Sequence, residues 1–151
     1  MATKPSTKKV MFKKDLSAKD SSENTLPAEP SGELVIKTLA MPANTNVSGD
    51  IFGGWIVSQM DIGGGILAKQ RAKSRAATVS IDKMIFRRPV HVGDMVSCYG
   101  KVTRVGRTSM TIEMTAWTRT IEDEVLHLVT EGVFTFVALD NKGKPHPVDR
   151  D

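Results

Sequence analysis

The chain has 151 residues, the length of one domain, and can bury a hydrophobic core without disulfides. Its formal net charge of +4 is modest, and its single cysteine, Cys98, excludes a disulfide framework. No apolar run reaches the roughly 18 residues of a membrane span, and the first residues contain neither the apolar core of a secretory signal nor an arginine. We therefore expect a cytoplasmic protein with no membrane or nucleic-acid partner.

Residues 1–30 are rich in Lys, Ser, Thr, Asp, Glu and Pro and hold only scattered apolar side chains. Such a segment cannot bury enough surface to offset the entropy lost on ordering, so we predict a disordered polar tail. Its lysines could touch RNA or an anionic surface. They lack interleaved aromatic residues and an accompanying motif, however, and this favours a plain solubilising tail.

Ordered structure is expected over residues 31–145, followed by a C-terminal tail at residues 146–151. A short apolar run at residues 34–41 is typical of a strand and stops at Pro42. A polar loop then leads into a helix from about Gly54 to Ala72. Four strand patterns follow, at residues 77–88, 95–105, 111–116 and 127–139, separated by turns and short breaks.

The order of these elements predicts an α+β fold. Short connections make the last four strands antiparallel neighbours, and the single helix of about five turns must pack on one face of their sheet. Because apolar or small side chains cover most of the helix circumference, either the sheet wraps around the helix or a second copy covers the remainder. A lone helix also leaves part of the sheet open, so we expect at least a dimer.

Asp61 is the unexpected residue of this apolar helix. Residues at helical spacing from it carry no positive charge, so no local ion pair explains it; they are Val57, Ser58, Gly64 and Gly65. It could face a solvated edge or hydrogen-bond to another segment. The run Gly63-Gly64-Gly65 costs on the order of 1 kcal/mol per residue relative to alanine, which is tolerable if another backbone or a ligand comes close. We therefore predict that Asp61 lies at a functional site.

Two motifs around this helix carry a family resemblance. They are Gly49-Asp50-Ile51-Phe52-Gly53-Gly54-Trp55 and Ser58-Gln59-Met60-Asp61. Residues 39–46 and 83–86, Pro89 and the turn at residues 92–94 agree with them in order and spacing. From about residue 34 to residue 145, the chain closely resembles the hotdog-fold acyl-CoA thioesterases of the bacterial YciA type.

The resemblance implies a hotdog fold, in which an antiparallel sheet wraps a central helix, and assembly as homodimers that often form a trimer of dimers, a hexamer. Members hydrolyse acyl-CoA to a free fatty or organic acid and coenzyme A, which is part of substrate and product, so no cofactor is expected. The family's catalytic acid falls on Asp61. Relatives use an asparagine or aspartate at the position of Asp50, contributed by the partner subunit.

The spacing along the chain agrees with a shared site. Asp61 lies about seven residues beyond the helix start, roughly 10 Å along its axis, whereas Asp50 precedes that start. This spacing keeps the two carboxylates of one subunit apart. Across a twofold interface, the loop of one copy can meet the helix of the other. Asp50 has an alternative role in the turn or as a helix cap, and the resemblance favours the site.

Thioester hydrolysis requires an activated water or a nucleophile, together with donors for the oxyanion. We predict that the N–H of Gly54, at the positive end of the helix, is the main oxyanion donor. Asp61 then acts as the general base for water or as the nucleophile that forms a mixed anhydride.

Substrate contacts are expected at two turns and in the apolar helix. Cations and hydroxyls for the phosphates of coenzyme A are expected at Arg107, Thr108 and Ser109, and secondarily at Arg88 and Arg87, although each arginine alone is also an ordinary solvated turn residue. The acyl pocket is predicted to include Trp55, Met60, Met84 and Phe86, which are equally suited to a plain core. The preferred acyl chain length depends on how these side chains pack.

Two other functions are compatible with the same fold. A hotdog hydratase typically uses a histidine, but neither the helix nor its leading loop contains one, and His91 and His146 are expected at the surface; the third histidine is His127. A non-catalytic acyl-CoA sensor would carry a DNA-binding module, for which residues 1–30 are too short. The histidines and Cys98 have no ligand-like spacing, so no metal site is predicted.

Overall fold

The computed structural model describes residues 25–150, so most of the predicted N-terminal tail, residues 1–24, lies outside the described residues. Residues 25–32 are largely exposed and precede the first strand. The elements, in chain order, are β1 (Glu33–Leu39), a 3-10 turn (Pro42–Asn44), α2 (Gly53–Ala72), β2 (Arg75–Phe86), β3 (Met95–Val105), β4 (Ser109–Arg119) and β5 (His127–Leu139). The expected order of one strand, one long helix and four strands is confirmed.

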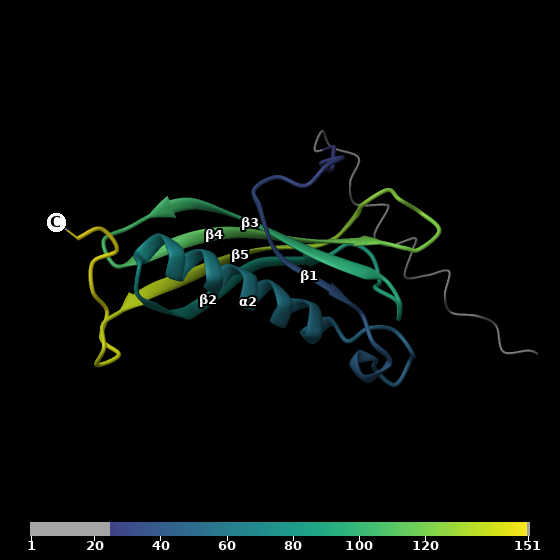
Figure 1. Ribbon diagram of the computed structural model, residues 1–151, viewed down its shortest axis with the longest axis horizontal. Helices are drawn as coiled ribbons and strands as arrows, with labels where there is room; N and C mark the ends of the chain where they lie inside the picture. Colours follow the sequence, from purple (N-terminus) through teal and green to yellow (C-terminus); the bar gives the residue numbers. More distant parts are fainter. Residues whose placement is uncertain (1–24, 151) are drawn as a thin grey trace, which may run out of the picture.

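The five strands form one antiparallel sheet in the order β1-β3-β4-β5-β2, and α2 lies across one face of it (Figure 1). Alternate residues of β4 face the helix and are fully buried; they are Met110, Ile112, Met114 and Ala116. This alternation buries one face of the strand because successive side chains point to opposite sides. The expected α+β architecture is confirmed. The predicted pairing of consecutive strands is correct for β3 with β4 and for β4 with β5, but it is wrong for β2 and β3, because β2 pairs with β5 and β3 pairs with β1.

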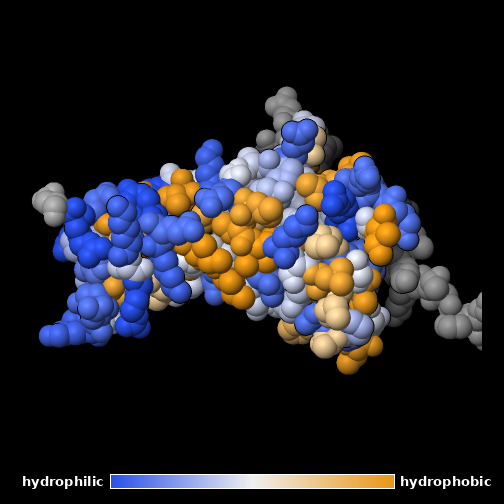
Figure 2. Space-filling model, in the orientation of Figure 1, coloured by the Kyte–Doolittle hydropathy of each residue, from blue (hydrophilic) through white to orange (hydrophobic). Residues whose placement is uncertain are grey.

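The two faces of α2 explain why its sequence is apolar nearly all round. One face packs on the sheet and buries Ile56, Met60, Leu67 and Ala68. The opposite face carries Ile62 and Ile66, which are 52% and 36% exposed. Figure 2 shows apolar surface gathered over the middle of the molecule, where α2 runs. Within residues 25–150, no other segment packs on this face of the helix.

The helical glycines have a different role from the one expected. A Cβ atom on Gly63 would lie 2.6 Å from Cγ2 of Val35, and one on Gly64 would lie 2.9 Å from the ring of Phe136. The close neighbours are therefore side chains of the protein's own sheet, and neither a backbone nor a ligand is needed to explain these glycines. They let α2 approach the sheet closely.

Strand β2 is an edge of the sheet, since it pairs only with β5. Irregularities interrupt the pairing between Thr78 and Ser80 and between Asp82 and Ile85. Its exposed large apolar side chains are Val79, Ile81, Ile85 and Phe86. Apolar side chains on an open edge strand favour pairing with another chain.

The chain stays attached to the sheet beyond residue 145, where a tail was expected. The N–H of His146 donates to the carbonyl of Ala138 at 3.0 Å, and the N–H of Val148 donates to the carbonyl of Arg107 at 2.9 Å. Val148 is buried. Residues 146–150 are thus part of the packed domain. Over residues 25–150, no helix is both long and apolar enough to cross a membrane.

Candidate active site

Asp61 is half-buried in the middle of α2, and its carboxylate is held by the neighbouring edge strand. The hydroxyl of Thr78 on β2 donates a hydrogen bond to Oδ1 of Asp61 at 2.5 Å. Within residues 25–150, no cation lies within ion-pair distance of this carboxylate, and no second hydrogen bond reaches it. Of the two ordinary roles considered for Asp61, the hydrogen bond to another segment is the one realised.

Thr78 is the site residue that sequence reasoning missed. The strand pattern at residues 77–88 places alternate side chains on one face, but it does not say which residue of that face lies beside which turn of the helix. A hydroxyl residue on the strand that follows the helix was the only available signal.

The start of α2 presents free backbone donors. Its N-cap is Phe52, in extended conformation and without a side-chain cap. The N–H groups of Gly53 and Gly54 have no acceptor in the described part of the chain, whereas that of Trp55 donates to the carbonyl of Phe52 at 3.0 Å. Together with the positive end of the helix dipole, two free N–H groups make a ready site for a developing oxyanion.

Aromatic rings flank these donors. A Cβ atom on Gly54 would lie 2.6 Å from the ring of Phe52, and one on Gly53 would lie 3.5 Å from the ring of Phe86. Only glycine at position 54 leaves the ring of Phe52 where it is.

Asp50 lies in a loop that a single side chain organises. Oδ1 of Asn46 accepts the N–H groups of Ser48 and Asp50, and the N–H of Asn46 donates to the carbonyl of Asp50 at 2.8 Å. The carboxylate of Asp50 remains about half exposed and does not cap α2, so the capping alternative is wrong. Its Oδ1 lies 3.8 Å from Nε2 of His91.

His91 is exposed, as expected of a surface residue, yet it lies between two acids. Its Nδ1 is 3.9 Å from Oδ2 of Asp94, and its backbone N–H donates to the same oxygen at 2.9 Å.

The arginines at the end of β2 are engaged within the protein. Arg87 donates to both carboxylate oxygens of Glu131, at 3.2 and 3.1 Å. Nη1 of Arg88 lies 3.2 Å from Nδ1 of His127. His127 in turn binds Asp123 at 2.8 Å, and this hydrogen bond lowers the pKa of the Asp123 carboxyl. These contacts orient the side chains along the strand ends.

The Arg107 turn lies at the opposite end of the molecule. The carbonyl of Thr108 accepts the N–H of Ala138, which pairs with Ala76 beside the end of α2. Arg87 follows Phe86, whose ring lies against Gly53 at the start of α2. Figure 1 shows the corresponding separation of the β3–β4 turn from the end of β2. The two predicted arginine groups are therefore not brought together within one chain.

The four predicted acyl-pocket residues are dispersed. Met60 is fully buried in the core, and the side chain of Met84 lies over Gly132 and packs against the same core. Trp55 is half-buried and Phe86 exposed near the helix start. Of the four, only Met60 is fully buried, so the other three are partly accessible to an acyl chain.

No metal centre is found within residues 25–150, where no three His, Cys, Asp or Glu side chains are close enough to hold an ion. Cys98 is buried and unpaired, and burial raises the pKa of its thiol to about 12. It is therefore a poor nucleophile at neutral pH.

Comparison with known proteins identifies the family of this chain. The model of the thioesterase superfamily matches residues 48–125, which include the helix start, Asp61 and Thr78. The chain belongs to the thioesterase superfamily. It is also 50% identical, over 127 residues, to the acyl-CoA thioester hydrolase YciA of Salmonella typhimurium; the match covers 82% of this chain and 96% of that protein.

Solved structures of the thioesterase superfamily share the fold. A hexameric broad-specificity acyl-coenzyme A thioesterase is 48% identical, with a TM-score of 0.77 and coverage of 80% of this chain and 89% of that chain. A hexameric hotdog-fold thioesterase of Campylobacter jejuni is 40% identical, with a TM-score of 0.74 and coverage of 78% and 91%. The expected hotdog fold is confirmed.

Proposed function

We propose that this protein hydrolyses the thioester of acyl-CoA to a free acid and coenzyme A. The observation that carries this proposal is the carboxylate of Asp61, held by the hydroxyl of Thr78 in an otherwise apolar helix. The similarity to an acyl-CoA thioester hydrolase supports the choice of substrate.

The geometry supports a direct role for Asp61 in the reaction. The hydroxyl of Thr78 donates a hydrogen bond to Oδ1 and so orients the carboxylate. The lone pairs of Oδ2 remain available to accept a proton or to attack a carbonyl. That oxygen removes a proton from the attacking water, or it attacks the thioester carbonyl and forms a mixed anhydride that water then cleaves. In the first case the proton that Asp61 removed from water passes to the departing sulfur, and coenzyme A leaves as the thiol. In the second case the C–S bond breaks as the anhydride forms, and coenzyme A leaves as a thiolate that takes a proton from water.

The amides of Gly53 and Gly54 supply the oxyanion site, with Gly54 as the main donor. A donor acts on the reacting carbonyl only from about 3 Å. Within one chain, Gly54 and Asp61 are seven residues apart, about 10 Å along the helix axis. One carbonyl cannot contact both groups of the same helix, so the site is completed by the helix start of a second copy, together with Asp50 of its loop.

A homodimer is the smallest active unit in this proposal. The open edge of β2 carries Val79, Ile81 and Ile85, and α2 exposes Ile62 and Ile66 beside it. Joining two such faces would bury apolar surface and cover both helices. We place three dimers in a hexamer, because solved relatives of this family are hexameric.

The remaining features of the proposal follow from the reaction. Water, a carboxylate and backbone donors suffice for hydrolysis, so no cofactor is required. The phosphates of coenzyme A are bound by Arg107, Thr108 and Ser109, with Arg88 and Arg87 at the other strand end as a second group. The buried, unpaired Cys98 supports a reducing, cytoplasmic location.

The test is thiol release from a panel of acyl-CoA chain lengths, followed with a colorimetric reagent. Wild-type protein should release coenzyme A, and Asp61→Ala should reduce turnover by about 10²-fold or more while the assembly remains folded. Glu122→Ala, an exposed acid in the β4–β5 connection, is the matched control. Binding of acyl-CoA without thiol release would indicate a sensor, and hydration of an enoyl-CoA would indicate a hydratase.

A further inference from the structure

Strand β2 is irregular between Asp82 and Ile85. Asp82 pairs with Val133 and Ile85 with Glu131, so two residues of β2, Lys83 and Met84, lie opposite a single residue of β5. Lys83 has a φ of 51°, in the left-handed region that residues other than glycine rarely adopt. Two residues opposite one, with the first in a left-handed conformation, is the geometry of a β-bulge.

This bulge decides which side chains of β2 face the helix. Ile81 pairs with the fully buried Phe134 and faces the core with it. Strict alternation from Ile81 would next direct Lys83 to the core and would turn Met84 and Phe86 to the opposite face. The extra residue reverses this order. Met84 packs against the core, and the ring of Phe86 lies against the start of α2.

The side chain of Met84 occupies a space that only glycine leaves open. A Cβ atom on Gly132 would lie 2.7 Å from Cε of Met84 and 3.1 Å from its Sδ, and it would lie 3.4 Å from the ring of Phe134. The thioether therefore lies directly on the backbone of β5. A methyl group at position 132 would lift the end of this side chain off the sheet, toward α2.

Three apolar side chains of β2 thus face α2 and are partly exposed. They are Ile81, Met84 and Phe86, and together they are named the β2 strip. One end of the strip adjoins Thr78, which faces the helix on the same strand and donates to Asp61. The other end lies against Gly53 at the start of α2. The strip therefore leads away from the proposed base along the edge strand.

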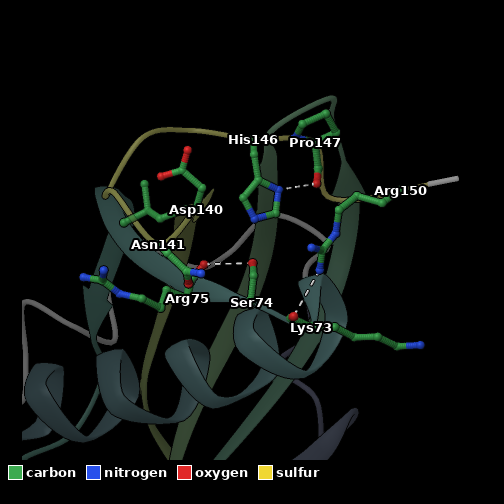
Figure 3. A pocket seen from close by; sticks show the side chains of 9 residues that line it. Lys73, Ser74, Arg75, Asp140, Asn141, His146, Pro147 and Arg150 are labelled. Atoms are coloured by element: carbon green, nitrogen blue, oxygen red, sulfur yellow. Dashed lines mark hydrogen bonds between the residues drawn. The ribbon is translucent and has the colours of Figure 1, made fainter.

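The opposite end of α2 is polar. The pocket at that end is lined mainly by charged and polar residues, among them Lys73, Arg75 and Arg150 (Figure 3). Covering such groups with an alkyl chain would remove their hydration without replacing it. An acyl chain whose carbonyl lies at Asp61 is therefore favoured to run along the β2 strip, toward the start of α2.

Met84 lies at some distance from the reacting carbonyl. Thr78 pairs with Phe136, and Met84 lies opposite Gly132, which is four residues away on β5, or about 13 Å. Short acyl groups end before this position, whereas long ones reach it. The methionine side chain is unbranched and flexible, so its position determines how much room a long chain finds.

We propose that Met84, placed by the bulge at Lys83 and by the glycine at position 132, sets the upper length of the acyl chain. The inference rests on the proposed function, because it assigns the β2 strip to the acyl group of acyl-CoA. Chains that end before Met84 fit on the strip, and longer chains must displace its thioether.

Two substitutions should move the preferred chain length in opposite directions. Met84→Ala lengthens the free strip, so the ratio of kcat/KM for dodecanoyl-CoA to kcat/KM for butyryl-CoA should rise about tenfold or more. Gly132→Ala lifts the thioether and should lower the same ratio by a similar factor. Its new methyl group meets only the flexible end of Met84 at close range, so the sheet is expected to fold.

Met95→Ala is the matched control, because Met95 is an equally half-buried methionine on β3, beside the core residue Val96. It should leave the ratio as in wild type. A plain core role for Met84 would lower the stability of Met84→Ala and reduce all rates alike. Unchanged ratios in Met84→Ala and Gly132→Ala, or shifts in the same direction, would overturn the inference.

Binding of S-alkyl-CoA thioethers separates this inference from the proposed function, because these compounds have no hydrolysable bond. Calorimetric titration of the full-length wild type should show affinity that rises with each added methylene and then levels off. In Met84→Ala the rise should continue to longer chains. If wild type releases no thiol but shows this pattern, hydrolysis fails and the alkyl site remains. Affinity independent of alkyl length in wild type would overturn the inference.

Discussion

The hydroxyl of Thr78 on β2 donates to the carboxylate of Asp61 on α2 at 2.5 Å, although the two residues are 17 positions apart in the chain. This contact ties the middle of the helix to the edge strand and sets the orientation of the acid. It also joins the proposed chemistry to the proposed dimer, because β2 is the open edge of the sheet.

Replacing Thr78 by Val should therefore impair the reaction more than substrate binding. Loss of the hydroxyl frees the carboxylate to rotate, so kcat is expected to fall about tenfold or more, with a small change in KM. Thr78→Ser keeps the donor and should restore most of the rate. Steady-state kinetics of the three proteins check this, and equal kcat values for Val and Thr would remove Thr78 from the site.

Two substitutions at Gly54 test whether its N–H stabilises the oxyanion. Gly54→Ala keeps the N–H but places a Cβ atom 2.6 Å from the ring of Phe52, which must then move. Gly54→Pro also removes the N–H, and a loss of about 10²–10³ in kcat beyond that of alanine is expected. Circular dichroism confirms that the helix still forms. Similar rates for the two variants would show that this N–H does not stabilise the oxyanion.

Two adjacent helical glycines should respond in opposite directions. A methyl group at Gly64 meets the ring of Phe136 at 2.9 Å, whereas at Gly65 the nearest contact is 3.7 Å. We expect Gly64→Ala to lower the free energy of unfolding by about 1–3 kcal/mol through overpacking. Gly65→Ala should leave it unchanged or raise it by up to about 1 kcal/mol through helix propensity. Urea unfolding at one protein concentration measures both.

A charge on the open edge of β2 should break the assembly. Ile81 is 40% exposed there, and Ile81→Lys would place an ammonium group in the proposed interface. We expect smaller particles in analytical ultracentrifugation and a loss of thiol release, since the site needs two copies. Ile121→Lys, at a 91% exposed loop residue, is the control. An active monomer would contradict the shared site.

Cys98 predicts a pH dependence of stability. Burial raises the pKa of its thiol from 9.0 to about 12, so the unfolded chain loses this proton at lower pH than the folded protein. Its contribution to stability is complete below pH 9 and is lost as the pH rises to about 12. The free energy of unfolding should fall with rising pH more steeply for wild type than for Cys98→Ala between pH 9 and about 12. Below pH 9 the two proteins should show the same slope. An identical slope in both proteins above pH 9 would show that Cys98 is not the cause.

The sequence by itself determined the elements and several of the functional candidates. Apolar periodicity and turn residues are local signals, so the helix, the strands along the chain and their antiparallel pairing were predictable. The place of β2 in the sheet, beside β5 and away from β3, was not. Asp61 was also identifiable, because an acid without a cation at helical spacing is unusual on an apolar helix. The free donors at Gly53 and Gly54 follow from the helix start alone.

Only the tertiary structure decided what lies beside these residues. The register of β2 against α2 brings Thr78 to Asp61, and the same packing fills the space over Gly63 and Gly64 with side chains of the sheet. Sheet topology sends the Arg87 and Arg107 turns to opposite ends and brings the C-terminal residues beside the end of α2. Contacts between distant segments depend on register and closure of the whole fold, which residue patterns within one segment do not encode.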